Sequence, residues 1–146
     1  MTAENEFVVA AVGNERFGFP LLNVERVVRS VHVTPLGDSD GDCLGTVSYH
    51  GELVPVFDLR PERGTEAKPV GLSEQFVVCK TSEGHRVLVV ESVLGVFTLA
   101  ADRLVAAEAI LPDLNYIAHV AKLPDGLITI LDPERFFNSK GGRSLR

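Results

Sequence analysis

Apolar residues along this chain occur in short runs separated by turn-forming residues, a pattern that predicts short β-strands. Glu6–Val12 and Glu15–Phe19 are two such runs with a Gly-Asn pair between them, so they predict a first β-hairpin. Leu44–Tyr49 and Glu52–Phe57 flank a His-Gly pair and predict a second hairpin. Short strands at regular spacing favour a barrel or a sandwich over a layered α/β fold.

The segments outside the hairpins carry clearer turn and helix signals. Pro20–Asn23 predicts a tight excursion, because proline fixes φ and has no N–H for a strand ladder. The chain is then expected to return to a strand near Val24–Val33. Later, Asp132 precedes Pro133 and two phenylalanines, which predicts an N-cap residue, a first helical residue and the apolar face of a short C-terminal helix. We expect the tail from Asn138 onward to fray.

Two stretches of sequence recur, which predicts that one domain of residues 1–146 contains two similar halves. The first half is expected at about 7–60 and the second at about 72–137, with the seam at 60–71 and with exchange of elements between the halves left open. Chance similarity among valine-rich strands is the alternative explanation. The recurring pairs are Phe7–Ala11 with Phe76–Lys80, and Val54–Asp58 with Ile128–Asp132.

The composition supports β structure and narrows the function classes. Valine occurs 21 times against 4 isoleucines and 11 alanines, and β-branched side chains favour strands. The net charge of −6 disfavours binding to nucleic acid. Glu4 and Glu6 stand where a signal peptide needs basic residues, and no apolar run approaches the roughly 20 residues that span a membrane. Cys43 and Cys79 are not in a C-x-x-C pair, so we expect unpaired thiols, a cytoplasmic location and no membrane insertion.

The residues that carry chemistry do not form a catalytic or metal-binding pattern. The histidines His32, His50, His85 and His119 lack the spacing of metal ligands, and His85 follows a turn glycine, where we expect a solvated side chain. A Cys43–His50 nucleophile and base would lack an orienting third residue.

Asp58 and Asp132 end equivalent strands, which suits either a carboxylate pair or, more simply, capping of backbone N–H groups. The loop Gly37–Cys43 is too acidic to hold phosphate. No cofactor, no metal and no enzymatic activity are therefore predicted.

The second hairpin carries a longer motif. The residues from Leu44 to Arg60 read LGTVSYHGELVPVFDLR, and they resemble the signature of CheW-like chemotaxis adaptors, roughly R/K-G-x-x-x-x-R-G-x-x-x-P-V-x-D-L-R. Supporting matches lie at Phe17–Val24, Val89–Val93 and Tyr116–Asp132, so the similarity extends from about Phe7 to about Phe137. The resemblance implies an all-β fold of two small five-stranded SH3-like β-barrels packed together, followed by a short C-terminal helix.

The resemblance also implies a function and a surface. Proteins of this family are non-catalytic adaptors that join the cytoplasmic tip of a methyl-accepting chemoreceptor to the regulatory domain of a CheA-type histidine kinase. Carried over by position, the family's partner-binding groove between the barrels falls on residues of both halves. Those positions in this sequence are Val24, Arg26, Gly45, His50, Phe76 and Val93.

Three positions depart from the family pattern, and one other function class stays open. The family usually has an acidic residue at Arg26, an arginine at His50 and often a glycine at His119. Arginine is a permanent planar cation, whereas histidine is neutral or charged depending on pH, so the choice of partner could differ here. The alternative is a β-barrel that binds a small molecule in an aromatic cavity. Its lining would be Phe17, Phe57, Phe76 and Phe97.

Overall fold

The computed structural model describes residues 5–35, 43–59, 71, 73–107 and 115–140, and these form eleven strands and one α-helix. The expected seam at 60–71 lies outside the described residues except for Gly71, and so does most of the acidic loop, 36–42. The elements in chain order are β1 (Glu6–Val12), β2 (Glu15–Pro20), β3 (Val24–Arg29), β4 (Cys43–Tyr49), β5 (Glu52–Asp58), β6 (Gln75–Thr81), β7 (Gly84–Val90), β8 (Ser92–Thr98), β9 (Leu104–Ala106), β10 (Ile117–Leu123), β11 (Gly126–Leu131) and α1 (Pro133–Lys140).

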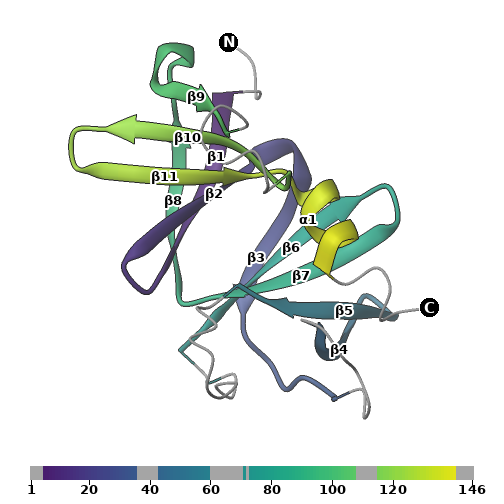
Figure 1. Ribbon diagram of the computed structural model, residues 1–146. Helices are drawn as coiled ribbons and strands as arrows, with labels where there is room; N and C mark the ends of the chain where they lie inside the picture. Colours follow the sequence, from purple (N-terminus) through teal and green to yellow (C-terminus); the bar gives the residue numbers. More distant parts are fainter. Residues whose placement is uncertain (1–4, 36–42, 60–70, 72, 108–114, 141–146) are drawn as a thin grey trace.

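The strands form two sheets that lie against each other (Figure 1). One sheet has six strands in the order β8-β1-β2-β11-β10-β9, and the other has five in the order β3-β6-β7-β5-β4. The extra strand over the expected five is β9, a three-residue segment at the edge of the larger sheet. The smaller sheet uses one continuous stretch from β3 to β7, while the larger sheet takes strands from both ends of the chain. The halves 7–60 and 72–137 therefore do not coincide with the two sheets, since each sheet contains strands from both halves.

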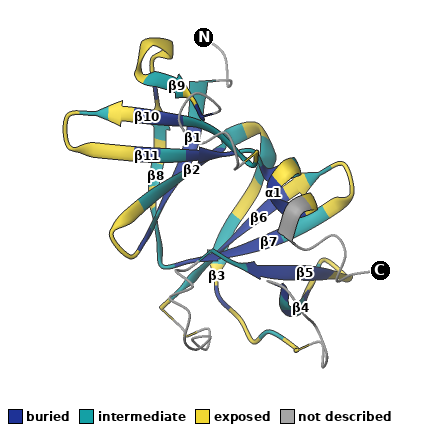
Figure 2. Ribbon diagram, viewed as in Figure 1, coloured by how far each residue is buried: buried dark blue, intermediate teal, exposed yellow. Residues whose placement is uncertain are grey.

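Strands at the centre of the molecule are buried on both faces, which explains their long apolar runs (Figure 2). In β6, Val77 and Cys79 belong to a central core between the sheets, whereas Phe76 and Val78 belong to a second core on the opposite face. In β1, Val8 and its alternate neighbours join the central core, and the intervening residues join a third core. Because side chains alternate along a strand, both of these strands contribute to two cores.

The four phenylalanines of the ligand-cavity alternative do not share a space. Phe57 lies in the central core with Phe17 packed against it, Phe76 lies in the second core, and Phe97 packs against the third. Phe57 and Phe76 are fully buried. The aromatic cavity expected from that alternative is therefore wrong, because these rings pack three separate cores.

Both predicted hairpins are confirmed. Strands β1 and β2 pair antiparallel, as do β4 and β5. In the second hairpin, His50 has φ 52° and Gly51 has φ 84°. Positive φ at both central residues is the requirement of a type I′ turn, whose twist matches the flanking strands. The excursion after β2 is a short 3-10 helix at Leu21–Asn23, and the strand that follows ends at Arg29 rather than continuing to residue 33.

The C-terminal helix begins as the sequence predicts. The backbone N–H of Arg135 donates to Oδ1 of Asp132 at 3.4 Å, and Pro133 is the first helical residue. Phe136 and Phe137 are buried in the central core, with the Phe137 ring 5.2 Å from that of Phe57. The helix continues to Lys140, past the expected start of fraying at residue 138. No helix in the described part of the chain is long and apolar enough to cross a membrane.

Candidate partner-binding surface

The residues expected at the partner surface fall into two structural groups. Val24 on β3, Arg26 on β3, His50 in the β4–β5 turn and Val93 on β8 are exposed or partly exposed. Val24 and Val93 both pack against the rim of the central core. Their backbones lie near opposite ends of β6, because Val24 pairs with Cys79, whereas the N–H of Val93 donates to Oε1 of Gln75 at 2.8 Å.

Phe76 and Gly45 are buried and support the sheet from inside. Phe76 is 1% exposed, so its ring fills the second core and offers no contact area to a partner. Gly45 lies at an irregularity in the β4–β5 pairing and has φ 150°. A Cβ there would come within 2.1 Å of the carbonyl oxygen of Thr34, so only glycine permits this close approach of backbone.

The exposed residues of the smaller sheet gather around Tyr49. The Tyr49 ring lies edge-on to His50, with centroids 4.3 Å apart, and edge-on to His85 at 5.4 Å. Burial and a hydrogen bond to Glu25 raise the pKa of the Tyr49 hydroxyl, while the guanidinium of Arg26 acts in the opposite direction. Arg26 and His50 therefore both lie near Tyr49, although 24 residues separate them in sequence.

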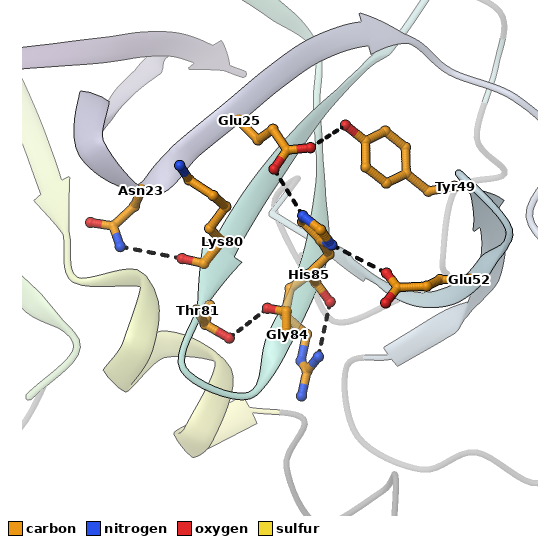
Figure 3. Close-up of polar contacts among 9 residues, drawn as sticks. Asn23, Glu25, Tyr49, Glu52, Lys80, Thr81, Gly84 and His85 are labelled. Atoms are coloured by element: carbon orange, nitrogen blue, oxygen red, sulfur yellow. Dashed lines mark hydrogen bonds and ion pairs between the residues drawn. The ribbon is translucent and has the colours of Figure 1, made fainter.

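A polar cluster, which we call the hairpin-tip cluster, joins four strands at this surface. It consists of Glu25, Tyr49, Glu52 and His85, from β3, β4, β5 and β7 respectively (Figure 3). Nε2 of His85 is 2.9 Å from Oε1 of Glu25, and Nδ1 is 3.2 Å from Oε1 of Glu52. The Tyr49 hydroxyl donates to the other oxygen of Glu25 at 2.7 Å. The cluster thus links the turn of the second hairpin to the edge strand β3.

The charges of the cluster reinforce one another. Hydrogen bonds that the ring donates to Glu25 and then to Glu52 raise the pKa of the His85 imidazole, and desolvation opposes them only partly. In turn, hydrogen bonds from Tyr49 and His85 lower the pKa of the Glu25 carboxyl. A carboxylate that accepts hydrogen bonds and a cation beside it each favour the other's charged form. The His85 side chain is only 27% exposed, so it is not the solvated turn residue expected from the sequence.

Sequence reasoning did not find this cluster, because its members share no local pattern. His85 lies 33 residues from Glu52 and 60 residues from Glu25. They meet only because the strand order β3-β6-β7-β5 brings β3 and β5 to either side of the β6–β7 hairpin. Knowledge of that order was the missing signal.

Comparison with known proteins decides the family. The family model of the CheW-like domain matches residues 6–141, which is nearly the whole chain. The chain belongs to the CheW-like family. The resemblance seen at the second hairpin is thereby confirmed over both sheets and the C-terminal helix.

Three known proteins illustrate the similarity. The chemotaxis protein CheW of Klebsiella aerogenes is 27% identical over 143 residues, covering 95% of this chain and 85% of that protein. Protein FrzA of Myxococcus xanthus is 32% identical over 92 residues, covering 63% of this chain and 58% of FrzA. The crystal structure of the scaffolding protein TtCheW from Thermoanaerobacter tengcongensis aligns with a TM-score of 0.79 at 20% identity and covers 92% of each chain. At this identity the structural match establishes the CheW fold, an all-β arrangement of two packed β units.

Proposed function

We propose that this CheW-like protein is a non-catalytic adaptor that couples the cytoplasmic tip of a chemoreceptor to the regulatory domain of a CheA-type histidine kinase. The observation that carries the proposal is membership of the CheW-like family over residues 6–141. A chemotaxis coupling adaptor is the function class that this membership gives.

The potentially reactive side chains support a role without catalysis. Cys43 and Cys79 are both buried. Burial raises the pKa of both thiols, that of Cys79 to about 12, so neither is a thiolate nucleophile near neutral pH. Among the described residues there is no group of three or more histidine, cysteine or acidic side chains that could hold a metal ion. Asp132 caps α1, which gives that carboxylate a structural role.

We assign receptor contact to the four accessible positions of the candidate surface: Val24, Arg26, His50 and Val93. Val24 and Val93 offer partly exposed apolar area at the rim of the central core. Arg26 adds positive charge near Tyr49, and His50 adds an imidazole ring beside it. A partner that presents carboxylates beside an apolar ridge fits this arrangement. Gly45 and Phe76 maintain the sheet on which these residues stand.

We expect the kinase domain to bind at an edge strand instead. An unpaired edge presents backbone N–H and C=O groups that a strand of another protein can join. In the described chain, β8 is such an edge of the six-stranded sheet, and it carries Leu94 and Val96 with exposed fractions of 49% and 56%. The kinase contact would then lie on the larger sheet, whereas Arg26 and the His50 turn belong to the smaller sheet. Val93, on the same strand β8, would adjoin the kinase contact.

Isothermal titration calorimetry with each purified partner tests the assignment. We expect affinities in the micromolar range, about −8 kcal/mol, for a signalling contact of this kind. Arg26→Glu should weaken binding of the receptor tip and leave binding of the kinase domain unchanged. Arg29→Glu, the same charge reversal at an exposed residue of the same strand, is the matched control. Equal loss in both variants would assign the effect to net charge, and no binding of either partner to the wild-type protein would refute the proposed function.

A further inference from the structure

The position of His85 between two carboxylates sets a condition on its protonation. Both ring nitrogens lie within hydrogen-bond distance of a carboxylate oxygen, Glu25 on one side and Glu52 on the other. A neutral imidazole has one N–H, and its other nitrogen is an acceptor. A carboxylate at neutral pH is also only an acceptor. Both contacts are therefore satisfied at once only when His85 carries two protons and a positive charge.

Loss of that proton removes one of the two contacts. Either Glu25 or Glu52 would then face the lone pair of the ring, and the repulsion would separate them. Glu25 keeps the hydrogen bond from the Tyr49 hydroxyl in either state, whereas Glu52 has His85 as its partner in the cluster. The side chain of Glu52 is 60% exposed, so it is free to turn into solvent. The side-chain contact between His85 of β7 and Glu52 of β5 is consequently the one that protonation controls.

The other charged groups around the ring do not replace these contacts. Lys80 of β6 pairs with His85 across the β6–β7 hairpin and lies close enough to lower the pKa of Glu25. Arg86, the next residue of β7, donates to the backbone carbonyl of His85 at 2.9 Å rather than to either carboxylate. Tyr49 of β4 interacts with Glu25 and lies near Arg26. The two carboxylates thus face His85 from β3 and β5, with Lys80 and Arg26 as the cations nearby.

The location of the cluster connects it to the candidate surface. Glu52 directly follows the His50-Gly51 turn, and Glu25 directly precedes Arg26 on β3. A contact that ties Glu52 and Glu25 to one ring therefore adds a side-chain link between the turn that carries His50 and the strand that carries Arg26, beside the Tyr49–Glu25 hydrogen bond. The carboxylates approach opposite nitrogens of the ring, so they do not converge on one point as ligands of a metal ion would.

We propose that His85 is a positioning residue: its protonated form braces the β4–β5 turn against β3, so that partner binding at Arg26 and His50 strengthens as pH falls and weakens as His85 loses its proton. This inference rests on the proposed function, because it concerns regulation of the same surface. The imidazole itself need not touch the partner. Its effect reaches the partner through Glu25 and Glu52.

Two measurements test the brace. The first is a titration of the histidine ring resonances by NMR on the free protein. The midpoint of His85 should lie above the reference value of ~6.5, and Glu25→Gln and Glu52→Gln should each lower it. The backbone amide of Gly51 should shift with the same midpoint in the wild-type protein and lose that transition in His85→Gln. A His85 midpoint at or below the reference value would overturn the proposal before any partner is added.

The second measurement is the affinity for the receptor tip at pH 6 and pH 8. It is made in a His50→Arg background, so that a second titrating ring does not contribute. Binding should be roughly two- to fivefold tighter at pH 6, the range of one exposed ion pair, and both His85→Gln and Glu52→Gln should remove the difference. His32→Gln, at an exposed histidine after β3, is the matched control and should retain it.

The outcomes separate the two claims. Binding that depends equally on pH with and without His85 would overturn the brace but leave the adaptor function in place. Absence of binding at both pH values would refute the proposed function and its regulation, while the NMR titration of the free protein would still report whether the brace exists. Glu52→Gln leaves the His85 ring and its contact with Glu25 in place, so it decides the matter even if His85→Gln does not fold.

Discussion

Substitution of Gly45 by alanine should destabilise the protein more than the same change at a similar glycine elsewhere. Gly45 lies where the pairing of β4 with β5 is irregular, and its backbone passes close to the segment at Thr34. Thr34 and Thr46 exchange two backbone hydrogen bonds there, both of 2.9 Å. A Cβ at residue 45 would lie 2.1 Å from the Thr34 carbonyl oxygen, so one of these chain segments must move.

Gly95 is the matched control for this change. It has φ 139°, close to the 150° of Gly45, and it also lies at an irregularity, in the pairing of β1 with β8. A Cβ at residue 95 would meet nothing within 4 Å. Alanine at either position should incur the backbone strain of a rarely populated φ, about 1–3 kcal/mol. At Gly45 alone, the two hydrogen bonds are also lost, at about 0.5–1.5 kcal/mol each.

The difference between the two variants is therefore the informative quantity. Gly45→Ala should lower the free energy of unfolding by about 1–3 kcal/mol more than Gly95→Ala does, from the two lost hydrogen bonds. With a urea m-value of about 2 kcal/mol/M, this moves the unfolding midpoint by roughly 1 M. The chain has no tryptophan, so far-UV circular dichroism is the suitable probe. Equal midpoints for the two variants would refute the close approach at Thr34 as the reason for glycine at this position.

Three further predictions concern other parts of the molecule. Phe137→Ala should lower the free energy of unfolding by about 3–5 kcal/mol, because the ring is 4% exposed and packs against Phe57. A melting curve like that of the wild type would exclude α1 from the core. His50→Arg should strengthen receptor binding at pH 8 by about 0.2–1 kcal/mol, as expected for an exposed pair with a permanent cation, and calorimetry that finds equal affinities would place His50 outside the interface. The pKa of His85 is raised in the folded protein, so the ion pairs of His85 stabilise the fold fully below the unfolded-state pKa, and this stabilisation is lost as pH rises through the folded-state pKa. The difference in unfolding free energy between wild type and His85→Gln should therefore be larger at pH 6 than at pH 8. A difference that grows with pH would contradict the pairing with Glu25.

Local signals in the sequence were enough to predict the hairpins and the helix. The His50-Gly51 turn needs positive φ at two adjacent residues, and Asp132 followed by Pro133 marks a helix start, so each feature depends on residues within a few positions. The family resemblance supplied the fold and the positions of the candidate partner surface. It also carried Phe76 into that surface, and a position-by-position transfer has no information on burial, which the structure gives as 1% exposed for this ring.

Long-range arrangement was the part that the sequence did not predict. Runs such as Val87–Val90 have no alternation of apolar and polar residues, because both faces of β7 are buried. Without alternation, the pattern cannot assign each side chain to a face. The internal repeat suggested a division near residue 60. The sheets instead follow strand pairing between distant parts of the chain, and Phe17 of β2 pairs with Thr129 of β11 in the same sheet.

In the sequence, the strands of the smaller sheet lie between the first two and the last four strands of the larger sheet, and this order determines which sheet can be completed first during synthesis. Strands β3 to β7 come from one uninterrupted stretch, so the five-stranded sheet has all its members once Val90 has been synthesised. The hairpin of β1 and β2 emerges earliest, yet its neighbours β8 and β11 are made only at Ser92–Thr98 and Gly126–Leu131. During that interval both outer edges of the nascent hairpin are unpaired and open to mispairing with other chains. The first strands of this domain are thus among the last to gain all their neighbours.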